Sequence, residues 1–249
     1  MTSDLQHGWL VNLGHANYLE VLDLQRELVK LRQAHRIPDT LLLVEHEPVI
    51  TLGRRGSTSN ILSSSEQLAS QGIKVHQVER GGDVTYHGLG QLVGYPVIDL
   101  TARKIGVRQF VDLLEETIIL TLVDFNIRAG RQSQHRGVWV EDLKVAALGV
   151  AVKRWVSFHG FALNVSPNLD HYCHINPCEL HHEQVTSMAR LSRKPPAMAV
   201  VIQKLMSRFG ELFSGEWREV PPAEVLRKIE AEDEPARAGV NPVPQIFPK

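Results

Sequence analysis

The glycine-rich segment from residue 80 to residue 91 constrains this chain more than any other. It reads Arg-Gly-Gly-Asp-Val-Thr-Tyr-His-Gly-Leu-Gly-Gln, with four glycines among charged, hydroxyl and imidazole side chains. Glycine lets a backbone adopt left-handed conformations and approach a ligand closely, while interleaved polar side chains fix the ligand's orientation. Strands are predicted on both sides, over 73–79 and 92–100, so a hairpin loop with solvated polar residues is the alternative.

The bulk properties exclude several classes of protein. The chain has 249 residues, of which 43% are hydrophobic and 22% charged, and its formal net charge is -1. These values are typical of a globular protein with one large domain or two small ones. No basic block indicates nucleic acid, no apolar run reaches transmembrane length, and Met1 to Trp9 lacks the pattern of a signal peptide. We therefore expect a cytoplasmic protein with neither nucleic-acid nor membrane partners.

Apolar periodicity and strand-like runs define the expected elements. Helices are predicted over 22–33, 107–125 and 197–213, with a short charged one from Pro221-Pro222 through Glu232. Ser63-x-x-Glu66 resembles a capping box that opens a further short helix ending near Gly72. Strands are predicted over 40–44, 49–52, 137–141, 144–152 and 156–165.

The order of these elements predicts the fold class. The last three strands lie close together in sequence, which is typical of an antiparallel meander. Strands do not alternate strictly with helices, so we expect an α+β fold. We predict one catalytic domain over 1–231 and a flexible proline-rich tail over 232–249.

Cys178 is a candidate nucleophile. It follows Ile-Asn-Pro, and the proline stiffens the approach to it. A thiol has a pKa of about 8.5, so it needs a basic or cationic neighbour to form the thiolate at neutral pH. The alternative is a small buried hydrophobe, which is the usual fate of a free cysteine. Cys173 lies five residues away, and in a reducing compartment we expect both to be thiols.

A zinc site is a second hypothesis for the same region. Cys173, His174, Cys178, His181 and His182 offer enough ligands for zinc. The spacing does not match the usual paired knuckles, so we expect no metal ion.

Lys144 is a candidate acid or base. It is a lone charge in the small and apolar run that follows Asp142. A lysine in such a strand commonly points to solvent. If it points inward, desolvation lowers its pKa, and it can exchange a proton near neutral pH or pair with a thiol. The basic turn from Gly53 to Gly56 is either a solvated loop or a docking point for an acidic partner or a phosphate.

The combination of motifs resembles a known family, the octanoyltransferases of lipoate biosynthesis. The resemblance runs from about residue 40 to about residue 213. Its most specific part is Arg80 to Gly88, followed by Gly90-Gln91 and Tyr95-Pro96. Other similar segments are Glu45 to Arg54, Gly137 to Val140, Lys144 to Gly149, Ser157 to Val165, Asn176 to Cys178 and Val185 to Ser187.

This resemblance implies a fold and a reaction. The fold is that of lipoate and biotin protein ligases, a single domain with a mixed, largely antiparallel sheet flanked by helices. The enzyme transfers an octanoyl group from acyl carrier protein to a lysine of lipoyl domains, in 2-oxoacid dehydrogenase subunits and the glycine cleavage H protein, and needs no cofactor.

The resemblance also implies the site residues. Cys178 forms the acyl thioester, and Lys144 lowers the pKa of the thiol and acts as acid or base. The residues implied to line the acyl site are Arg80, Gly81, Gly82, Asp83, Val84, Thr85, Tyr86, His87, Ala147, Leu148, Gly149, Gly160, Phe161 and Ala162.

One position departs from the family pattern. The family usually has glycine after Pro-Cys, and this chain has Glu179. A carboxylate that faces the thiolate raises the pKa of the thiol. Two alternatives stay open, an ATP-dependent lipoate or octanoate ligase of the same fold and a non-catalytic, zinc-stabilised module that binds lipoyl domains.

Overall fold

The fold is centred on one large mixed sheet. The structure is a computed structural model that describes residues 7–133, 135–176 and 184–233. The sheet has seven strands in the order β10-β1-β2-β6-β9-β8-β7. Its strands are β1 (His7–Ala16), β2 (Asp39–His46), β6 (Gln91–Val97), β7 (Val138–Val140), β8 (Leu143–Lys153), β9 (Val156–Asn164) and β10 (Glu216–Glu219).

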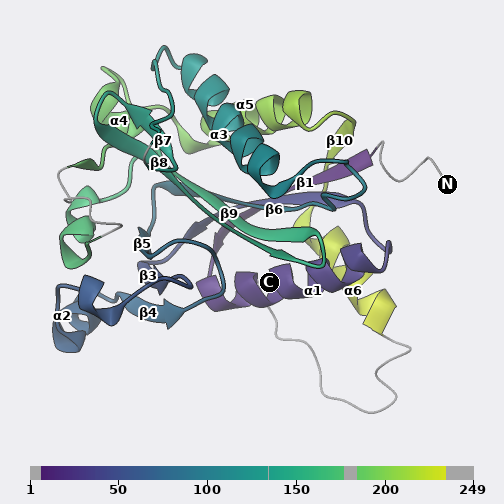
Figure 1. Ribbon diagram of the computed structural model, residues 1–249, viewed down its shortest axis with the longest axis horizontal. Helices are drawn as coiled ribbons and strands as arrows, with labels where there is room; N and C mark the ends of the chain where they lie inside the picture. The colour runs from purple at the N-terminus through teal and green to yellow at the C-terminus, as the bar shows by residue number, and fades with distance from the viewer. Residues whose placement is uncertain (1–6, 134, 177–183, 234–249) are drawn as a thin grey trace.

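Strand directions are mixed, and antiparallel pairs dominate. β10 and β2 run parallel to β1, whereas the four pairs from β2 to β7 are antiparallel. A smaller sheet of β4 (Lys74–Gln77), β3 (Val49–Leu52) and β5 (Val84–His87) lies beside the large one (Figure 1). The predicted α+β class and the largely antiparallel mixed sheet are confirmed.

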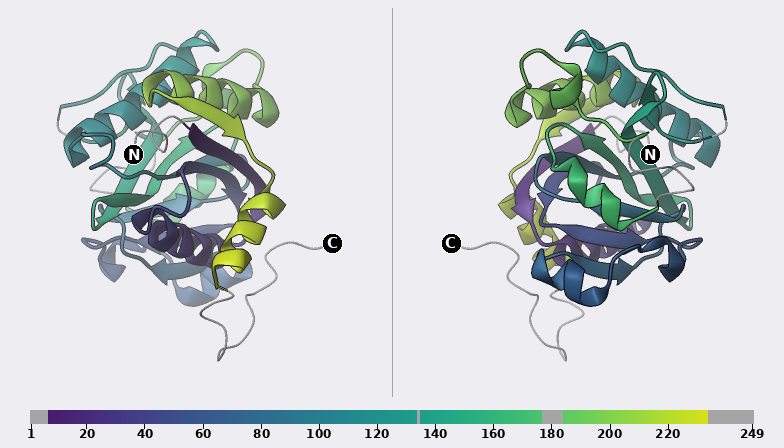
Figure 2. Two further views of the ribbon diagram at one scale, coloured as in Figure 1. Left: turned by 90° about the vertical axis from the view of Figure 1, so that its right-hand side faces the viewer. Right: turned by 90° about the vertical axis from the view of Figure 1, so that its left-hand side faces the viewer.

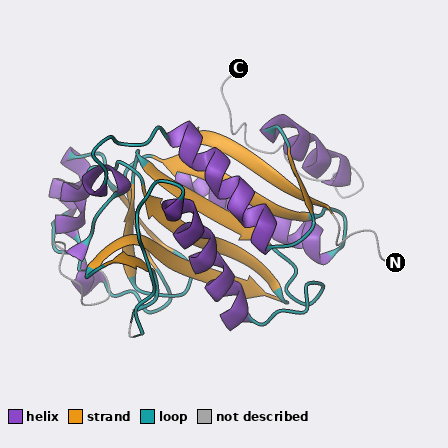
Figure 3. Cartoon of the chain, turned by 90° about the horizontal axis from the view of Figure 1, so that it is seen from above, coloured by secondary structure: helices purple, strands orange, loops and turns teal. Residues whose placement is uncertain are grey.

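Helices cover both faces of the large sheet. On one face lie α3 (Val107–Val123) and α5 (Met198–Leu212), which cross the strands in Figure 3. On the other face lie α1 (Tyr18–Gln33) and α6 (Pro222–Asp233), which are neighbours in Figure 2. The described residues also form two short α-helices, α2 (Ser65–Ser70) and α4 (Met188–Leu191), and two 3-10 helices, η1 (Thr58–Asn60) and η2 (Leu169–His174). No described helix is long and apolar enough to cross a membrane.

Each face of the sheet has its own core. The α3 and α5 side buries Phe110, Leu114 and Phe209 against Phe161 and Leu163 of β9. The opposite side buries the apolar face of α1 against β2 and β6. Because successive residues of a strand point to opposite faces, neighbouring residues of β8 and β9 serve different cores. This alternation decides which residues can meet a ligand on either side of the sheet.

Most predicted elements are confirmed, and the differences have local causes. The three-strand meander is β7-β8-β9, paired antiparallel throughout. The capping box lies one residue later than predicted, because Ser64 caps α2 and Gln67 returns the bond to the Ser64 backbone. Val84–His87 is a strand within the glycine-rich segment, consistent with its β-branched and aromatic residues. Strands β1 and β10 were not predicted.

Candidate active site

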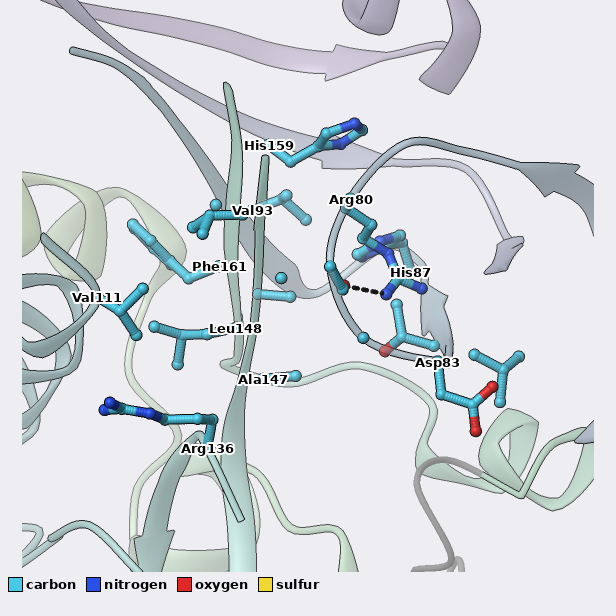
Figure 4. Close-up of a pocket in the computed structure, with 18 of the residues that line it drawn as sticks. Arg80, Asp83, His87, Val93, Val111, Arg136, Ala147, Leu148, His159 and Phe161 are labelled. Carbon is cyan, nitrogen blue, oxygen red and sulfur yellow. Dashed lines mark hydrogen bonds between the residues drawn. The ribbon is translucent and has the colours of Figure 1, made fainter. Parts of the chain in front are cut away.

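A cavity of about 840 Å³ lies where the glycine-rich segment approaches β8 and β9. It extends around the edge of β8, because residues from both faces of that strand line it. In Figure 4 Ala147 and Leu148 project to opposite sides of the strand. We call the part between the two sheets, lined by Ala147, Gly149, Gly160 and Ala162, the inter-sheet lobe. We call the part beneath α3, lined by Val107, Val111, Leu148 and Phe161, the α3 lobe.

The structure brings nearly all the predicted site residues to this cavity. Tyr86 does not line it, and Cys178 lies outside the described residues, as do Glu179, His181 and His182. The predicted residues that line the cavity are Arg80, Gly81, Gly82, Asp83, Val84, Thr85, His87, Lys144, Ala147, Leu148, Gly149, Gly160, Phe161 and Ala162.

Tyr86 turns away from the cavity because it alternates with Thr85 and His87 along β5. Its ring lies in a separate core with Ile50. Its hydroxyl lies 2.6 Å from Nδ1 of His171. Tyr86 therefore packs in the core of the small sheet. The family resemblance implied instead that it lines the acyl site.

Arg80 holds the glycine-rich segment in place. Its Nη2 donates to the Thr51 carbonyl at 2.6 Å and to Thr51 Oγ1 at 2.9 Å. Its Nη1 donates to the Gly81 carbonyl at 3.1 Å, the contact dashed in Figure 4. The Gly81 amide donates in turn to the Val150 carbonyl of β8 at 2.9 Å. Arg80 is thus largely committed to fixing the wall of the cavity.

Small residues leave room in the inter-sheet lobe. Ala147 pairs with Ala162, and Gly149 with Gly160, across β8 and β9. A Cβ added at Gly149 would lie 3.0 Å from the Gly81 carbonyl oxygen, so only glycine allows the segment to approach this closely. The result is a narrow slot with walls of backbone and methyl groups, suited to an unbranched apolar chain.

The protonation of His87 follows from its partner Gln91. The Gln91 amide nitrogen donates to Asn164 Oδ1 at 2.9 Å and also reaches Tyr86 and Tyr172, so its oxygen must accept. His87 Nδ1 therefore donates to that oxygen at 2.7 Å, and its Nε2 keeps a lone pair. Burial, with His46 nearby, lowers the pKa of His87 to about 3, so the ring is neutral at physiological pH.

Two further histidines lie close to His87. His46 Nδ1 donates to the Ala16 carbonyl at 2.8 Å, and its Nε2 accepts from the Tyr95 hydroxyl at 2.8 Å. Burial lowers the pKa of His46 to about 4. His159 lines the cavity, is 1% exposed, and its Nε2 has no hydrogen-bond partner among the described residues. Burial also lowers the pKa of His159, although Glu79 opposes the effect.

These buried histidines make the fold sensitive to acid. The pKa values of His46 and His87 lie below the ordinary 6.5, so below that pH the unfolded chain binds more protons than the folded one. The free energy of unfolding should therefore fall between pH 7 and pH 5, by about 2 kcal/mol for each of the two. Urea titrations at both pH values measure this difference. His46→Phe should reduce it, and the same change at the exposed His7 should not.

Lys144 lines the cavity and lies beside an aromatic ring. Its Nζ is 4.7 Å from the centroid of the Trp139 ring, within range of a cation–π interaction. Gly137 has a φ of 137°, and a Cβ there would lie 3.1 Å from Lys144 Cε. Glycine at 137 therefore leaves the space that the lysine side chain occupies. Lys144 lines the cavity, so its side chain is not directed only to solvent.

The segment that contains Cys178 is attached to the cavity wall on both sides. Before it, the Asn176 amide donates to the Asn60 carbonyl at 2.8 Å, and Asn60 Nδ2 donates to Asp83 Oδ2 at 2.6 Å. After it, the Thr186 amide donates to the Lys144 carbonyl at 2.9 Å. Asp83 and Lys144 both line the cavity. The chain therefore leaves one wall of the cavity before Cys178 and returns to another after it.

The described residues give no support to a zinc site. None of them form a group of three or more potential ligands placed to hold a metal. His174 has partners at both ring nitrogens, Ser63 Oγ at 2.7 Å and Gln71 Oε1 at 2.9 Å. The other histidines of the proposed ligand set, His181 and His182, lie outside the described residues.

Several lining residues escaped the sequence analysis. Val107 and Val111 of α3 line the α3 lobe, yet their helical spacing is typical of a core-facing stripe. Arg108 and Arg136 stand beside them. His159 belonged to a segment that carried the family resemblance, which was the available signal.

Comparison with known proteins identifies the family. The model for the lipoyl protein ligase A/B catalytic domain matches residues 17–210. Octanoyltransferases from Caldicellulosiruptor saccharolyticus and Alkaliphilus metalliredigens are 46% and 47% identical to the chain. The matches cover 87% and 82% of this chain, and 94% of each relative.

Solved structures show the same fold at low sequence identity. Lipoate-protein ligase A, crystallised with ATP, has a TM-score of 0.73 at 16% identity, over 91% of this chain and 94% of that one. A bipartite lipoate protein ligase from Thermoplasma acidophilum has a TM-score of 0.72 at 15% identity, over 92% of both chains. The resemblance inferred from the motifs and the expected ligase fold are both confirmed. The chain therefore belongs to the octanoyltransferase family, acyltransferases built on the catalytic domain of lipoyl protein ligases A and B.

Proposed function

We propose that this enzyme transfers an octanoyl group from octanoyl-acyl carrier protein to a lysine of lipoyl domains, through a thioester on Cys178. The acceptors are the lipoyl domains of 2-oxoacid dehydrogenase subunits and the glycine cleavage H protein. The observation that carries the proposal is the cavity itself. A slot of small residues and Lys144 line the same cavity, and the segment holding Cys178 is attached to the cavity wall at both ends.

The reaction has two steps. In the first, the Cys178 thiolate attacks the thioester carbonyl of the donor and forms a new C–S bond, and the bond from the carbonyl carbon to the pantetheine sulfur breaks. The departing pantetheine thiolate takes a proton from the Lys144 ammonium group, which leaves Lys144 neutral. In the second, the neutral amine of the acceptor lysine attacks the acyl-enzyme carbonyl. A C–N bond forms, the bond to Cys178 Sγ breaks, and the proton lost by the amine passes to Lys144.

The energetics of the two steps explain why the second step needs a base. Exchange of one thioester for another is nearly balanced, whereas formation of the amide runs downhill. An acceptor lysine has an ordinary pKa of about 10.4, so a base in the site is needed to take its proton. Lys144 is the described lysine that lines the cavity. The donor is already activated, and no ATP is consumed.

The acyl chain fits the inter-sheet lobe. Ala147, Gly149, Gly160 and Ala162 line it without large side chains. Burial of an eight-carbon chain there contributes about 0.8 kcal/mol for each methylene. The neutral His87 at the same lobe carries no charge that would oppose burial of the chain.

Mass spectrometry of the intact protein tests the first step. Wild-type enzyme mixed with octanoyl-acyl carrier protein should gain one octanoyl group, located on Cys178 by peptide mapping. Cys178→Ser should form no thioester adduct, whereas Cys173→Ser, which replaces an exposed thiol, should react as wild type does. Lack of an adduct in the wild type, or a wild-type adduct that peptide mapping locates on a residue other than Cys178, contradicts the thioester route.

The ligase alternative is tested with the same protein. A ligase of this fold would modify lipoyl domains with free octanoate and ATP. The proposal predicts no modification under those conditions and full modification with the carrier-protein thioester. The reverse result would assign the chain to the ligases.

A further inference from the structure

The α3 lobe has a different chemical character from the acyl slot. Its walls are the side chains of Val107 and Val111 from α3, with Leu148 and Phe161 from the sheet. Arg108 stands at its rim. Figure 4 shows Val111, Phe161 and Leu148 together on one side of β8, opposite the glycine-rich segment. An apolar wall beside a basic rim suits a ligand that is apolar in the middle and anionic at one end.

Part of the β8 edge that faces away from β9 has no backbone hydrogen-bond partner among the described residues, between the end of β7 and Gly81. β7 pairs with it as far as Ala146, and the Val150 carbonyl accepts the Gly81 amide. Backbone groups alternate in direction along a strand, so the N–H and C=O of Leu148 point to the same edge as those of Val150. No described residue bonds them from that side. Leu148 therefore offers one donor and one acceptor at the cavity, the pair that an amide recognises.

Two arginines, Arg108 and Arg136, line this part of the cavity, and they differ in whether neighbouring carboxylates neutralise them. Arg136 is bound to Asp112 at 2.7 Å and to Glu115 at 3.1 Å. Arg108 is exposed and forms no ion pair with any residue in the described part of the chain. A ligand with one phosphate diester therefore fits the open end of the lobe, where Arg108 is unpaired among the described residues. A carboxylate-rich surface fits it less well, because such a surface would also meet the negative charge of Asp112.

We propose that the α3 lobe binds the phosphopantetheine arm of the donor. An amide of the arm pairs with the Leu148 N–H and C=O, the dimethyl carbon of the arm contacts Val107 and Val111, and the phosphate contacts Arg108. The acyl chain then lies in the inter-sheet lobe, so the thioester is held where the two lobes meet around β8. This inference rests on the proposed function, because it assigns the donor of that reaction to a part of the same cavity.

A series of truncated donors tests the assignment. Formation of the Cys178 adduct is followed with four donors, namely octanoyl-carrier protein, octanoyl-phosphopantetheine, octanoyl-pantetheine and S-octanoyl ethanethiol. Arg108→Ala should lower kcat/KM roughly fivefold or more for the two donors with phosphate, and leave the other two unchanged. Arg227→Ala, which removes an exposed cation on the opposite face of the sheet, should change none.

A proline substitution tests the amide contact. Leu148→Pro removes an N–H that is outside the β8–β9 ladder, so the strand should still form. It should lower kcat/KM roughly threefold to tenfold for every donor with an amide and spare S-octanoyl ethanethiol. Val152→Pro, at another position facing the same edge but outside the cavity, is the matched control.

The outcomes separate the two proposals. If no donor forms an adduct on Cys178, the proposed function itself is wrong. If adducts form but Arg108→Ala affects donors with and without phosphate equally, the assignment of the lobe is overturned. It is also overturned if Arg108→Ala slows only the transfer to a lipoyl domain, because the lobe would then belong to the acceptor.

Discussion

Replacing Lys144 with methionine should lower octanoyl transfer to a lipoyl domain by roughly 10²-fold to 10⁴-fold, the usual contribution of a general base. Methionine keeps an unbranched side chain beside Trp139 and removes the amino group whose Nζ lies 4.7 Å from the centroid of that ring. The acyl-enzyme then has no lysine in the described cavity to take the proton of the incoming amine. Stopped-assay kinetics with a purified lipoyl domain measure the loss.

The acceptor identifies the role that Lys144 plays. Hydroxylamine is largely uncharged at neutral pH and attacks a thioester without a base, so it should release the octanoyl group from Lys144→Met enzyme at nearly the wild-type rate. Lys144→Arg should not restore transfer to lysine, because arginine cannot give up its proton at neutral pH. Lys153→Met, at the exposed end of the same strand, is the matched control. Full activity in Lys144→Met would exclude this lysine as the base.

Local pattern was sufficient for most of the fold. The stripes in 107–125 and 197–213 predicted α3 and α5 because those helices bury one face on the sheet. The meander followed from three apolar runs separated by short turns, because strands joined by short turns pair antiparallel with their neighbours in sequence. Strands β1 and β10 were missed for the opposite reason. β1 pairs with β10, about two hundred residues away, and no pattern within His7–Ala16 indicates so distant a partner.

The site was predictable as a set of segments and not as a geometry. Glycines and polar residues in 80–87 indicated contact with a ligand, and seven predicted residues from elsewhere in the chain line the same cavity, namely Lys144, Ala147, Leu148, Gly149, Gly160, Phe161 and Ala162. The sequence did not reveal that Tyr86 alternates out of the wall, or that Arg80 is bound to Thr51. Both depend on the direction of β5 relative to β3, which is a property of strand pairing. The α3 lobe could not be predicted either, because Val107 and Val111 are apolar residues of a helix that also packs on the core, and their spacing does not distinguish the two roles.

Filling the inter-sheet lobe should change which acyl chain the enzyme accepts. Ala147 lies on the slot side of β8 and pairs with Ala162, so Ala147→Phe places a ring in the slot with little disturbance of the ladder. If the ring excludes the outer four methylenes of an octanoyl chain, the lost burial is about 3 kcal/mol, or roughly a 10²-fold lower kcat/KM. A butyryl donor should be affected far less. Competition between octanoyl and butyryl donors, read from the adduct masses, measures the ratio directly.

The next residue along the strand provides the control. Leu148 points to the α3 lobe, so Leu148→Phe adds a ring of the same kind on the other face of β8 and should leave the octanoyl-to-butyryl ratio at its wild-type value. A shift in the ratio for Leu148→Phe but not for Ala147→Phe would place the acyl chain in the α3 lobe. That result would exchange the contents of the two lobes, since the donor arm and its acyl group must leave the thioester in different directions. One pair of adjacent substitutions thus decides on which side of β8 the chain is buried.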